Sequence, residues 1–494
     1  MYFRMAVILV ITLYTARIIF NALGVKDYGI YNVVGSIIIL FSFINSGLSN
    51  ATKRYITAEI ASGDDESRRI IFNSAIIAHI FISIIIFVIA ETVGLWMVNE
   101  FLNLPEERMF AANIAFQLSV ATAIVNIMQS PFISAILAYE KMSIYAYLTI
   151  VDVTCKLLIA FLIQVMSGDK LIFYSTFIFL IGVINVIVYK LYCNHCFPMC
   201  RWLLVREKHI LKKMFNYTSW SLIGQGAAVL SNQGVNFILN LFCGVVVNAA
   251  MGISNQITKV VNDFVINFQY AFNPQITKLY VSDNIEDLKK LVWRSSRYSS
   301  FLVLLFLLPV CFEAADFLLL WLGDYPEYSV EFCVLTMICV YLEAITAPLW
   351  MVLCSDTNIK VYQLTVSTIF LLNVFLSWIF MVLGQPPFTV MAVRIFVDVV
   401  LILTRLLFVK NKIEGFCVWG WIKDVFGNSV LIIIVPLLCT FVLSDLHYPN
   451  TIVRFLIIGL ISMLITLFSI IVIGLTKNEK AFLIKNAKEK LRLI

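Results

Sequence analysis

The chain has 494 residues, of which 61% are hydrophobic and 13% are charged, and its mean hydropathy is +0.93. A soluble protein carries about twice that charged fraction, so the composition excludes a soluble globular protein. The net charge of +6 is not a nucleic-acid footprint, because no connection between the apolar segments is long enough to form an extramembrane domain. Basic residues that face an anionic cytoplasmic leaflet explain the excess.

From the N-terminus onward, about fourteen apolar segments are long enough to cross a hydrocarbon core about 30 Å thick. A helix is the only open structure that pairs all its backbone groups in lipid. We therefore predict an all-α polytopic membrane protein with about fourteen transmembrane helices. The expected spans are 5–23, 28–51, 72–98, 110–138, 144–166, 171–190, 214–241, 246–273, 298–321, 331–354, 360–383, 388–409, 428–445 and 451–475.

The basic residues between the spans fall mostly on alternate connections. If the N-terminus is cytoplasmic, only Lys26, Arg108 and Lys170 lie on the outer connections. By the positive-inside rule, this pattern predicts a multi-pass membrane protein with both termini in the cytoplasm.

The chain repeats itself once. The segment 130–145 aligns without a gap with 347–362, so that Pro131 matches Pro348 and Tyr145 matches Tyr362. Repeats of six spans give parallel halves related by an axis along the membrane normal. We expect an N-terminal six-helix bundle, a second six-helix bundle, and two additional helices with a basic cytoplasmic tail. Their expected ranges are 1–213, 214–410 and 411–494.

Polar residues inside the spans form stripes on single helical faces. Lys259 and Asp263 are four residues apart in span 246–273, where they lie on one face and can pair. Spans 5–23, 28–51 and 214–241 carry similar stripes, and their convergence between the halves would make a hydrated, cationic cavity. Interhelical hydrogen bonding is the alternative role for the amides. The expected polar lining is Asn21, Asn45, Gln225, Asn232, Asn236 and Asn255.

Other charged residues within the spans suggest ion pairs or sites of ion coupling, because isolated charges at bilayer depth are unfavourable. Several stand four residues from a residue of opposite charge, and Glu343 lies deep in its span. These candidates are Asp152, Lys156, Asp263, Glu343 and Asp398.

No enzyme motif is present: the chain has no Walker loop, no G-x-S-x-G and no H-E-x-x-H. We predict no catalytic activity, no cofactor and no metal site. The loop with Cys193, Cys196 and Cys200 offers soft ligands, but its spacing matches no familiar zinc knuckle. Whether it binds a metal stays open.

The run from Ala16 to Tyr31 contains Arg17, then Leu23-Gly24, and then Tyr28-Gly29-Ile30-Tyr31. With the small-residue segment that follows the second span, it resembles the opening of Wzx-type polysaccharide flippases. These belong to the multidrug/oligosaccharidyl-lipid/polysaccharide exporter superfamily, whose length and six-plus-six architecture the whole chain also fits.

The resemblance implies a transporter that flips undecaprenyl-pyrophosphate-linked oligosaccharide repeat units from the cytoplasmic to the periplasmic leaflet. Such units supply O-antigen, lipopolysaccharide, capsule or exopolysaccharide, and the implied partners are the bilayer, a polysaccharide polymerase and glycosyltransferases. Arg17 takes the place of the motif's arginine, and Arg54 is the basic end of the second helix. Lys259 matches by position a cationic cavity group of related lipid II flippases. The candidate diphosphate-binding residues are Arg17, Arg54, Lys259 and Arg394.

Three alternatives remain. An ion-coupled multidrug antiporter of the same superfamily predicts acidic groups deep in the cavity. A membrane polymerase needs a long outer loop, which is absent. A non-transport scaffold for glycosyltransferases would use the basic connections 191–213 and 274–297 but has no need of polar stripes.

The tail Lys477–Arg492 is either an amphipathic helix on the inner leaflet or a solvated segment.

Overall fold

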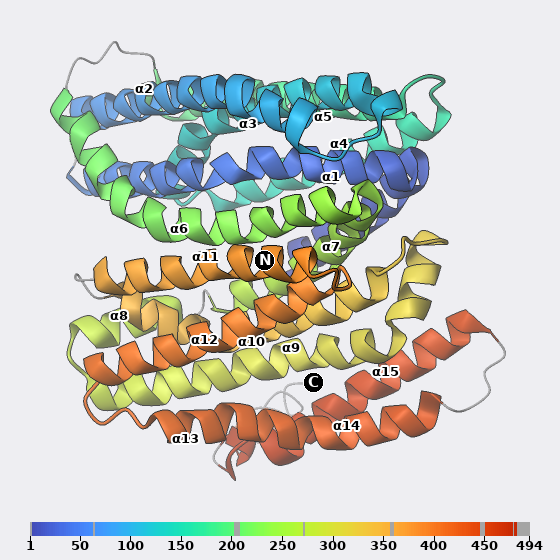
Figure 1. Ribbon diagram of the computed structural model, residues 1–494. Coiled ribbons are helices and arrows are strands. Elements are labelled where there is room, and N and C mark those ends of the chain that lie inside the picture. The colour runs from blue at the N-terminus through green and yellow to red at the C-terminus, as the bar shows by residue number, and fades with distance from the viewer. Residues whose placement is uncertain are drawn as a thin grey trace, which may run out of the picture. The chain divides into compact units, whose positions relative to one another are not determined.

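The computed structural model describes residues 2–62, 65–201, 208–269, 272–355, 360–444, 450–477 and 479–481. Helices make up the regular structure of these ranges, and no strand occurs in them (Figure 1). Every expected span falls on a helix. The chain is therefore an all-α, multi-pass membrane protein, as its apolar pattern predicts.

The chain packs into two compact units. Unit 1 comprises Met1–Gly252 and Gln363–Pro387, and unit 2 comprises Ile253–Tyr362 and Phe388–Ile494. The boundary between them falls inside one helix, α7, and α11 joins unit 1 although it follows unit 2 helices in sequence. The division into 1–213, 214–410 and 411–494 stays a prediction.

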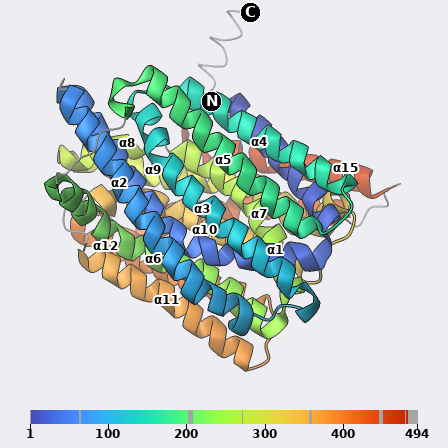
Figure 2. The same ribbon diagram turned by 90° about the horizontal axis from the view of Figure 1, so that it is seen from above.

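Unit 1 is built from long helices joined by short turns, and Figure 2 shows α2, α3 and α5 running side by side. Its elements are α1 (Tyr2–Ser62), α2 (Asp65–Ile89), η1 (Ala90–Gly94), η2 (Met97–Phe101), η3 (Glu106–Arg108), α3 (Met109–Ala138), α4 (Met142–Val165), α5 (Lys170–Cys196), η4 (Pro198–Cys200), α6 (Lys208–Cys243), the first part of α7 (Val245–Gln269) and α11 (Lys360–Val382).

Unit 2 is centred on α9, which packs against α10, α14 and α15. Its elements are the rest of α7, α8 (Asn273–Val281), α9 (Ile285–Leu322), α10 (Ser329–Ser355), α12 (Thr389–Lys412), α13 (Val418–Ile422), η5 (Lys423–Gly427), α14 (Asn428–Ser444), α15 (Thr451–Ser469) and η6 (Ile470–Gly474).

The first two expected spans are one continuous element, α1, broken only at Gly24. That residue has φ 76° and ψ 172°, a conformation that glycine adopts without the penalty of a Cβ. The other glycine of the sequence motif has a different role. A Cβ on Gly29 would lie 2.0 Å from the carbonyl oxygen of Val245, so α1 and the start of α7 touch backbone to backbone there.

Ten helices in the described ranges are long and apolar enough to cross a membrane, with the two arms of α1 counted as one. Helices α6, α7 and α12 are not among them: α12 carries Arg394, Asp398 and Arg405, and α7 and the described part of α6 contain several amide side chains. The helix that starts at Asp65 continues through two π-helical turns, η1 and η2. The repeat partners Pro131 and Pro348 lie within α3 and α10.

Candidate functional site

Unit 1 contains a cavity of about 370 Å³ among α1, α2, α3 and α5. Aliphatic side chains and the ring of Tyr31 form most of its wall. No charged side chain lines it in the described part of the chain. Its polar lining consists of Asn32, Asn45, Ser119, Thr122, Asn126 and Ser175.

The hydroxyl groups of this cavity are already engaged with their own helices. Ser119, Thr122 and Ser175 each donate to the carbonyl oxygen four residues earlier, at 2.7, 2.7 and 2.9 Å. Such bonds are usual for hydroxyl side chains inside membrane helices. They use the single proton of each hydroxyl and leave its oxygen as an acceptor.

An amide network beside the cavity ties α1 to α6 and α7. Asn32 donates from Nδ2 to the Asn248 carbonyl oxygen at 2.8 Å, and Asn248 donates to the Asn236 carbonyl oxygen at 2.9 Å. Asn236 donates to Ser36 Oγ at 3.2 Å, and Asn240 donates to Asn248 Oδ1 at 3.0 Å. These amides hold helices together, the alternative role considered above.

The other residues expected to line a polar cavity lie in different places. Asn45 lines the cavity of unit 1, whereas Asn236 is 4% exposed and belongs to the amide network. Asn21 and Asn232 are exposed, and Asn255 is half-buried on the part of α7 in unit 2. The side chains of Gln225 and Arg54 lie outside the described residues.

Arg17 is half-buried on α1, on the same face as Tyr14 and Asn21, both of which are exposed. The opposite face, with Ile18 and Ile19, packs into the unit 1 core. No hydrogen bond or ion pair of the Arg17 guanidinium is formed with the residues that the structure describes.

Lys259 and Asp263 are both exposed on α7. They do not form an ion pair within the described residues, although their spacing allows one. The Asp263 carbonyl oxygen accepts from Asn267 at 2.6 Å, a bond within the helix.

Arg394 is paired inside unit 2. Its guanidinium bonds to Asp398, with Nε 3.1 Å from Oδ1, and to the Glu343 carboxylate on α10. Arg394 and Asp398 are buried, at 8% and 3% exposed. Arg405 completes this end of α12 by donating to Thr346 Oγ1 at 2.7 Å. The structure thus brings together one predicted diphosphate ligand and two predicted coupling carboxylates, as partners of one another.

Asp152 and Lys156 form an ion pair on α4, with Nζ 2.7 Å from Oδ2. Asn185 on α5 donates to the other carboxylate oxygen of Asp152, also at 2.7 Å. The pair therefore links two neighbouring helices of unit 1.

Sequence reasoning missed a charge cluster at the predicted outer end of unit 1. Arg108 bonds to Asp27 at 2.8 Å, just past the Gly24 break, and to Asp169 at 2.6 Å. Asp169 also caps α5 by accepting from the amides of Leu171 and Ile172. Burial acts to raise the pKa of Asp169, but the hydrogen bonds from Arg108 and these amides hold that pKa below its usual value. The sequence signal is an Asp before an apolar run, which is an N-cap pattern.

A second missed residue is Glu91 in the π-helical turn η1. Its Oε2 accepts from Gln117 Nε2 on α3 at 3.0 Å, and its Oε1 is buried without a partner among the described residues. A carboxylate inside an apolar helix, at a local π-bulge, is a signal that the sequence contained.

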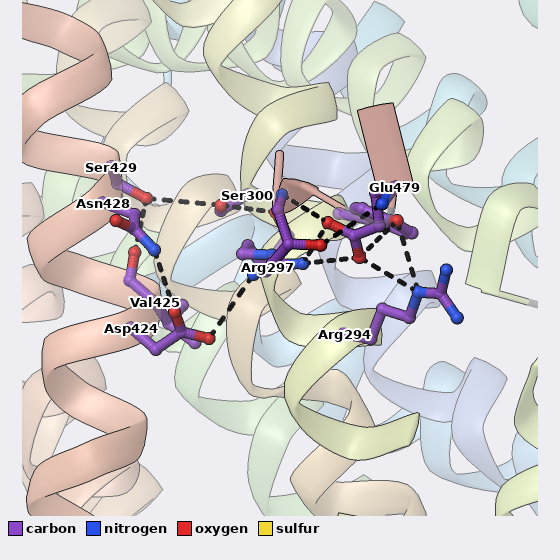
Figure 3. A network of polar contacts seen from close by, with 10 residues as sticks. Arg294, Arg297, Ser300, Asp424, Val425, Asn428, Ser429 and Glu479 are labelled. Carbon is purple, nitrogen blue, oxygen red and sulfur yellow. Dashed lines mark hydrogen bonds and ion pairs between the residues drawn. The ribbon is translucent and has the colours of Figure 1, made fainter. Parts of the chain in front are cut away.

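The third missed cluster joins Glu479, which follows η6, to α9. Figure 3 shows Glu479 between Arg294 and Arg297, with Asp424 on the other side of Arg297. The Arg297 guanidinium contacts the Glu479 carboxylate at 2.6 and 2.7 Å and Asp424 at 3.8 Å. Thr476 and Glu479 also bond reciprocally, amide to side chain, as in a capping box.

The cysteine loop ends α5. Cys193 and Cys200 are buried and Cys196 is exposed. Cys193 Sγ donates to the Phe132 carbonyl oxygen at 3.6 Å. Within the described ranges, no group of three His, Cys, Asp or Glu residues is placed to hold a metal ion.

No protein-family model and no curated protein sequence matches the chain. Solved structures do. The inward-closed lipid II flippase MurJ has a TM-score of 0.69 at 13% identity, over 95% of this chain and 97% of its own. An inward-facing multidrug resistance MATE family transporter of the MOP superfamily has a TM-score of 0.68 at 12% identity, over 82% and 96%. A MATE transporter of Vibrio cholerae has a TM-score of 0.52 at 14% identity, over 82% and 99%.

The chain has the fold of the MATE and MurJ transporters. The MATE structures leave a larger share of it unmatched than the MurJ structure does. At these identities the likeness describes the fold alone. Among the described residues of that fold, Arg17 on α1 has no ion-pair partner, and the cavity of unit 1 has no charged side chain in its lining.

Proposed function

We propose that the chain flips a lipid-linked oligosaccharide, an undecaprenyl-pyrophosphate-linked repeat unit, from the cytoplasmic to the periplasmic leaflet of a bacterial inner membrane. The product would feed the assembly of a surface polysaccharide such as O-antigen, capsule or exopolysaccharide. Glycosyltransferases would supply the substrate and a polymerase would consume it.

The observation that supports this proposal most is that Arg17 has no carboxylate partner among the described residues. Arg108, Arg297 and Arg394 each contact two carboxylates. Arg17 is half-buried inside a membrane helix and has no such partner among the described residues. A charge in that position is unfavourable unless an anion approaches it. A diphosphate is such an anion, and a guanidinium binds phosphate oxygens in a bidentate manner.

Two further points support a flippase. The similar MurJ structure is that of a lipid II flippase, and the similarity extends over 95% of this chain. The sequence motif around Arg17 also has a structural basis, because Gly24 breaks α1 and Gly29 allows the contact with Val245. The motif therefore maintains the geometry of the helix that presents the arginine.

In the proposed mechanism, cationic side chains bind the diphosphate while the prenyl chain stays in lipid, and Arg17 and Lys259 are the candidates. Electrostatic attraction is stronger in a low-dielectric site than in water, so few cations suffice. Alternating exposure to the two sides of the membrane, as in other transporters built from repeats, would complete the transfer. Arg54 belongs to the same proposed cationic set.

A multidrug antiporter is the second candidate, because MATE transporters share the fold. That function needs carboxylates free to bind a cation. Glu343 and Asp398 are instead paired with Arg394 and Asp152 with Lys156, which leaves Asp263 as the predicted coupling carboxylate without an ion pair among the described residues, and no charged side chain of these residues lines the unit 1 cavity. These features favour the flippase over the antiporter.

The test uses a strain that lacks the chromosomal copy of the gene. We expect Arg17→Ala to lower surface polysaccharide about 10- to 100-fold, the factor that corresponds to one charge-assisted hydrogen-bonded contact. Arg17→Lys should retain part of the activity. Lys26→Ala is the matched control, because Lys26 forms only an exposed pair with Glu107. Protein level is measured by immunoblot, and unchanged polymer in both Arg17→Ala and Lys259→Ala would remove the cationic mechanism.

A further inference from the structure

The lining of the unit 1 cavity presents several hydrogen-bond acceptors, beside the amides of Asn45 and Asn126, which carry both donors and acceptors. Ser119, Thr122 and Ser175 have donated their protons to helix carbonyls, so their oxygens present only lone pairs. Asn45, which also lines the cavity, has a buried Oδ1 with no partner among the described residues. A ligand that satisfies this lining must bring several donors.

The ligand must also be neutral. No carboxylate, lysine or arginine is among the lining residues that the structure describes. Burying a phosphate or an ammonium group there would desolvate a charge without a counter-charge, which is strongly unfavourable. Hydroxyl groups meet both requirements, because they donate protons and carry no charge.

The rest of the wall fits the shape of a sugar ring. Ile38, Ile86, Ile127 and Ile178 provide aliphatic surface, and Tyr31 provides an aromatic ring. That ring is held in place by an edge contact with Tyr174, at 4.9 Å between centroids. A pyranose has apolar C–H faces and a rim of hydroxyl donors. The volume of about 370 Å³ lies at the lower end of the usual range for ligand sites.

We propose that this cavity is a subsite for one neutral sugar ring of the oligosaccharide. The proposal rests on the proposed function, since transport is what would bring an oligosaccharide to unit 1. It adds a division of labour: cations bind the diphosphate, and neutral acceptors on α1, α3 and α5 bind a sugar.

The first experiment measures protection of the cavity from alkylation. Ala123 is small, half-buried and part of the lining. The full-length Ala123→Cys protein in nanodiscs is treated with N-ethylmaleimide, and modification at position 123 is followed by peptide mass spectrometry. Native Cys155, on α4 and outside the lining, is the internal reference. The probes are the methyl glycosides of glucose, galactose and N-acetylglucosamine, with sorbitol and sodium chloride as controls.

We expect at least one glycoside to slow modification at position 123 while Cys155 is unaffected, with half-maximal protection in the range of about 1–10 mM, as suits so small a ligand. Thr122→Val keeps the side-chain shape and removes one acceptor, so it should weaken binding about 2- to 12-fold. Thr176→Val is the matched control. Thr176 makes the same bond to its own helix, at 2.8 Å to Ile172, outside the cavity lining. Saturation-transfer NMR with the same glycosides measures both variants without the added cysteine.

Any of three results would overturn the subsite. In the first, no glycoside slows alkylation at position 123 of a monodisperse protein; in the second, sodium chloride slows it but sugars do not. In the third, Thr122→Val and Thr176→Val weaken glycoside binding equally. Failure of the subsite leaves the polysaccharide defect of Arg17→Ala in place. If the flippase proposal is wrong, the glycosides still protect position 123, but the strain with Arg17→Ala makes a normal amount of surface polysaccharide. The two failures are therefore distinguishable.

Discussion

The two units stabilise their interiors by different means. The buried interior of unit 1 relies on close backbone approach and neutral amides, as at Gly29 against Val245 and in the network around Asn248, and its ion pairs at Arg108 and Lys156 are more exposed. Unit 2 relies on charge pairs. Arg394 contacts Glu343 and Asp398, and Arg297 contacts Glu479 and Asp424. A third pair set joins Arg454 to Glu313 and Asp316.

This difference shows which polar groups are available for a ligand. In unit 2 the buried charges are neutralised by one another, so they contribute to packing between helices. In unit 1 the amides and hydroxyls are partly satisfied, and some of the acceptors that remain, such as Asn45 Oδ1, belong to residues that line the cavity. Arg17 and Lys259 stand apart from both patterns, since neither has an ion-pair partner within the described ranges.

The largest loss of stability is expected from Arg394→Gln. It leaves Asp398 buried without its cation, and breaking a buried ion pair destabilises a protein by about 3–5 kcal/mol. Asn248→Ala in unit 1 removes neutral hydrogen bonds and should cost only about 1–3 kcal/mol. Thermal unfolding in detergent, read by fluorescence-detected size exclusion, measures both.

The double variant Arg394→Gln with Asp398→Asn should recover part of the lost stability, because both charges are then gone. Equal losses for Arg394→Gln and Asn248→Ala would break the contrast between charged and neutral packing.

The next test concerns close packing in unit 1. Gly29→Ala places a Cβ 2.0 Å from the Val245 carbonyl oxygen, so backbone must move. We expect a loss of about 3 kcal/mol, the upper end of the range for overpacking. Gly24→Ala meets no atom within 4 Å and suffers only from its φ of 76° with ψ 172°, a region that essentially only glycine adopts, which costs about 1–3 kcal/mol. A larger loss for Gly24→Ala than for Gly29→Ala would contradict the backbone contact. Unfolding of each purified variant is followed as above.

A smaller effect than for Arg394→Gln is expected from Glu479→Gln, about 2 kcal/mol near neutral pH, because Arg297 keeps Asp424 at 3.8 Å and the amide oxygen of glutamine still accepts a hydrogen bond. Burial acts to raise the pKa of Glu479, but hydrogen bonds from Thr476 and Tyr298 and the charge of Arg297 hold that pKa below its usual value. A carboxylate with a lowered pKa stabilises the fold above its unfolded pKa, and this stabilisation is lost as the pH falls through its folded pKa.

We therefore expect the melting temperature of the wild type to decrease when the pH is lowered below about 4.5. The decrease should be smaller in Glu479→Gln. Glu107→Gln is the control, since its pair with Lys26 is exposed on both sides. Identical acid profiles of the wild type and Glu479→Gln would show that the network of Figure 3 does not stabilise the fold.

Much of the fold was predictable because membrane spans are local properties of sequence. Length and apolarity placed every span on a helix, and the motif around Gly24 and Gly29 marked a real feature of α1. The candidate site was less accessible. Spacing predicted the Asp152–Lys156 pair correctly, yet the same spacing at Lys259 and Asp263 gives no pair among the described residues. The orientation, the substrate and the domain division stay predictions.

The sequence by itself determined that this is a helical, multi-pass membrane protein and which residues are polar where lipid should exclude them. Only the tertiary structure decided what those residues contact. Arg394 meets Glu343 across 51 positions of sequence, and Arg297 meets Glu479 across 182. A side chain's charge is local, but its neutralisation depends on which helices pack together. The tertiary structure alone therefore separates the paired cations from Arg17 and assembles, from α1, α2, α3 and α5, a cavity whose described lining carries no charge.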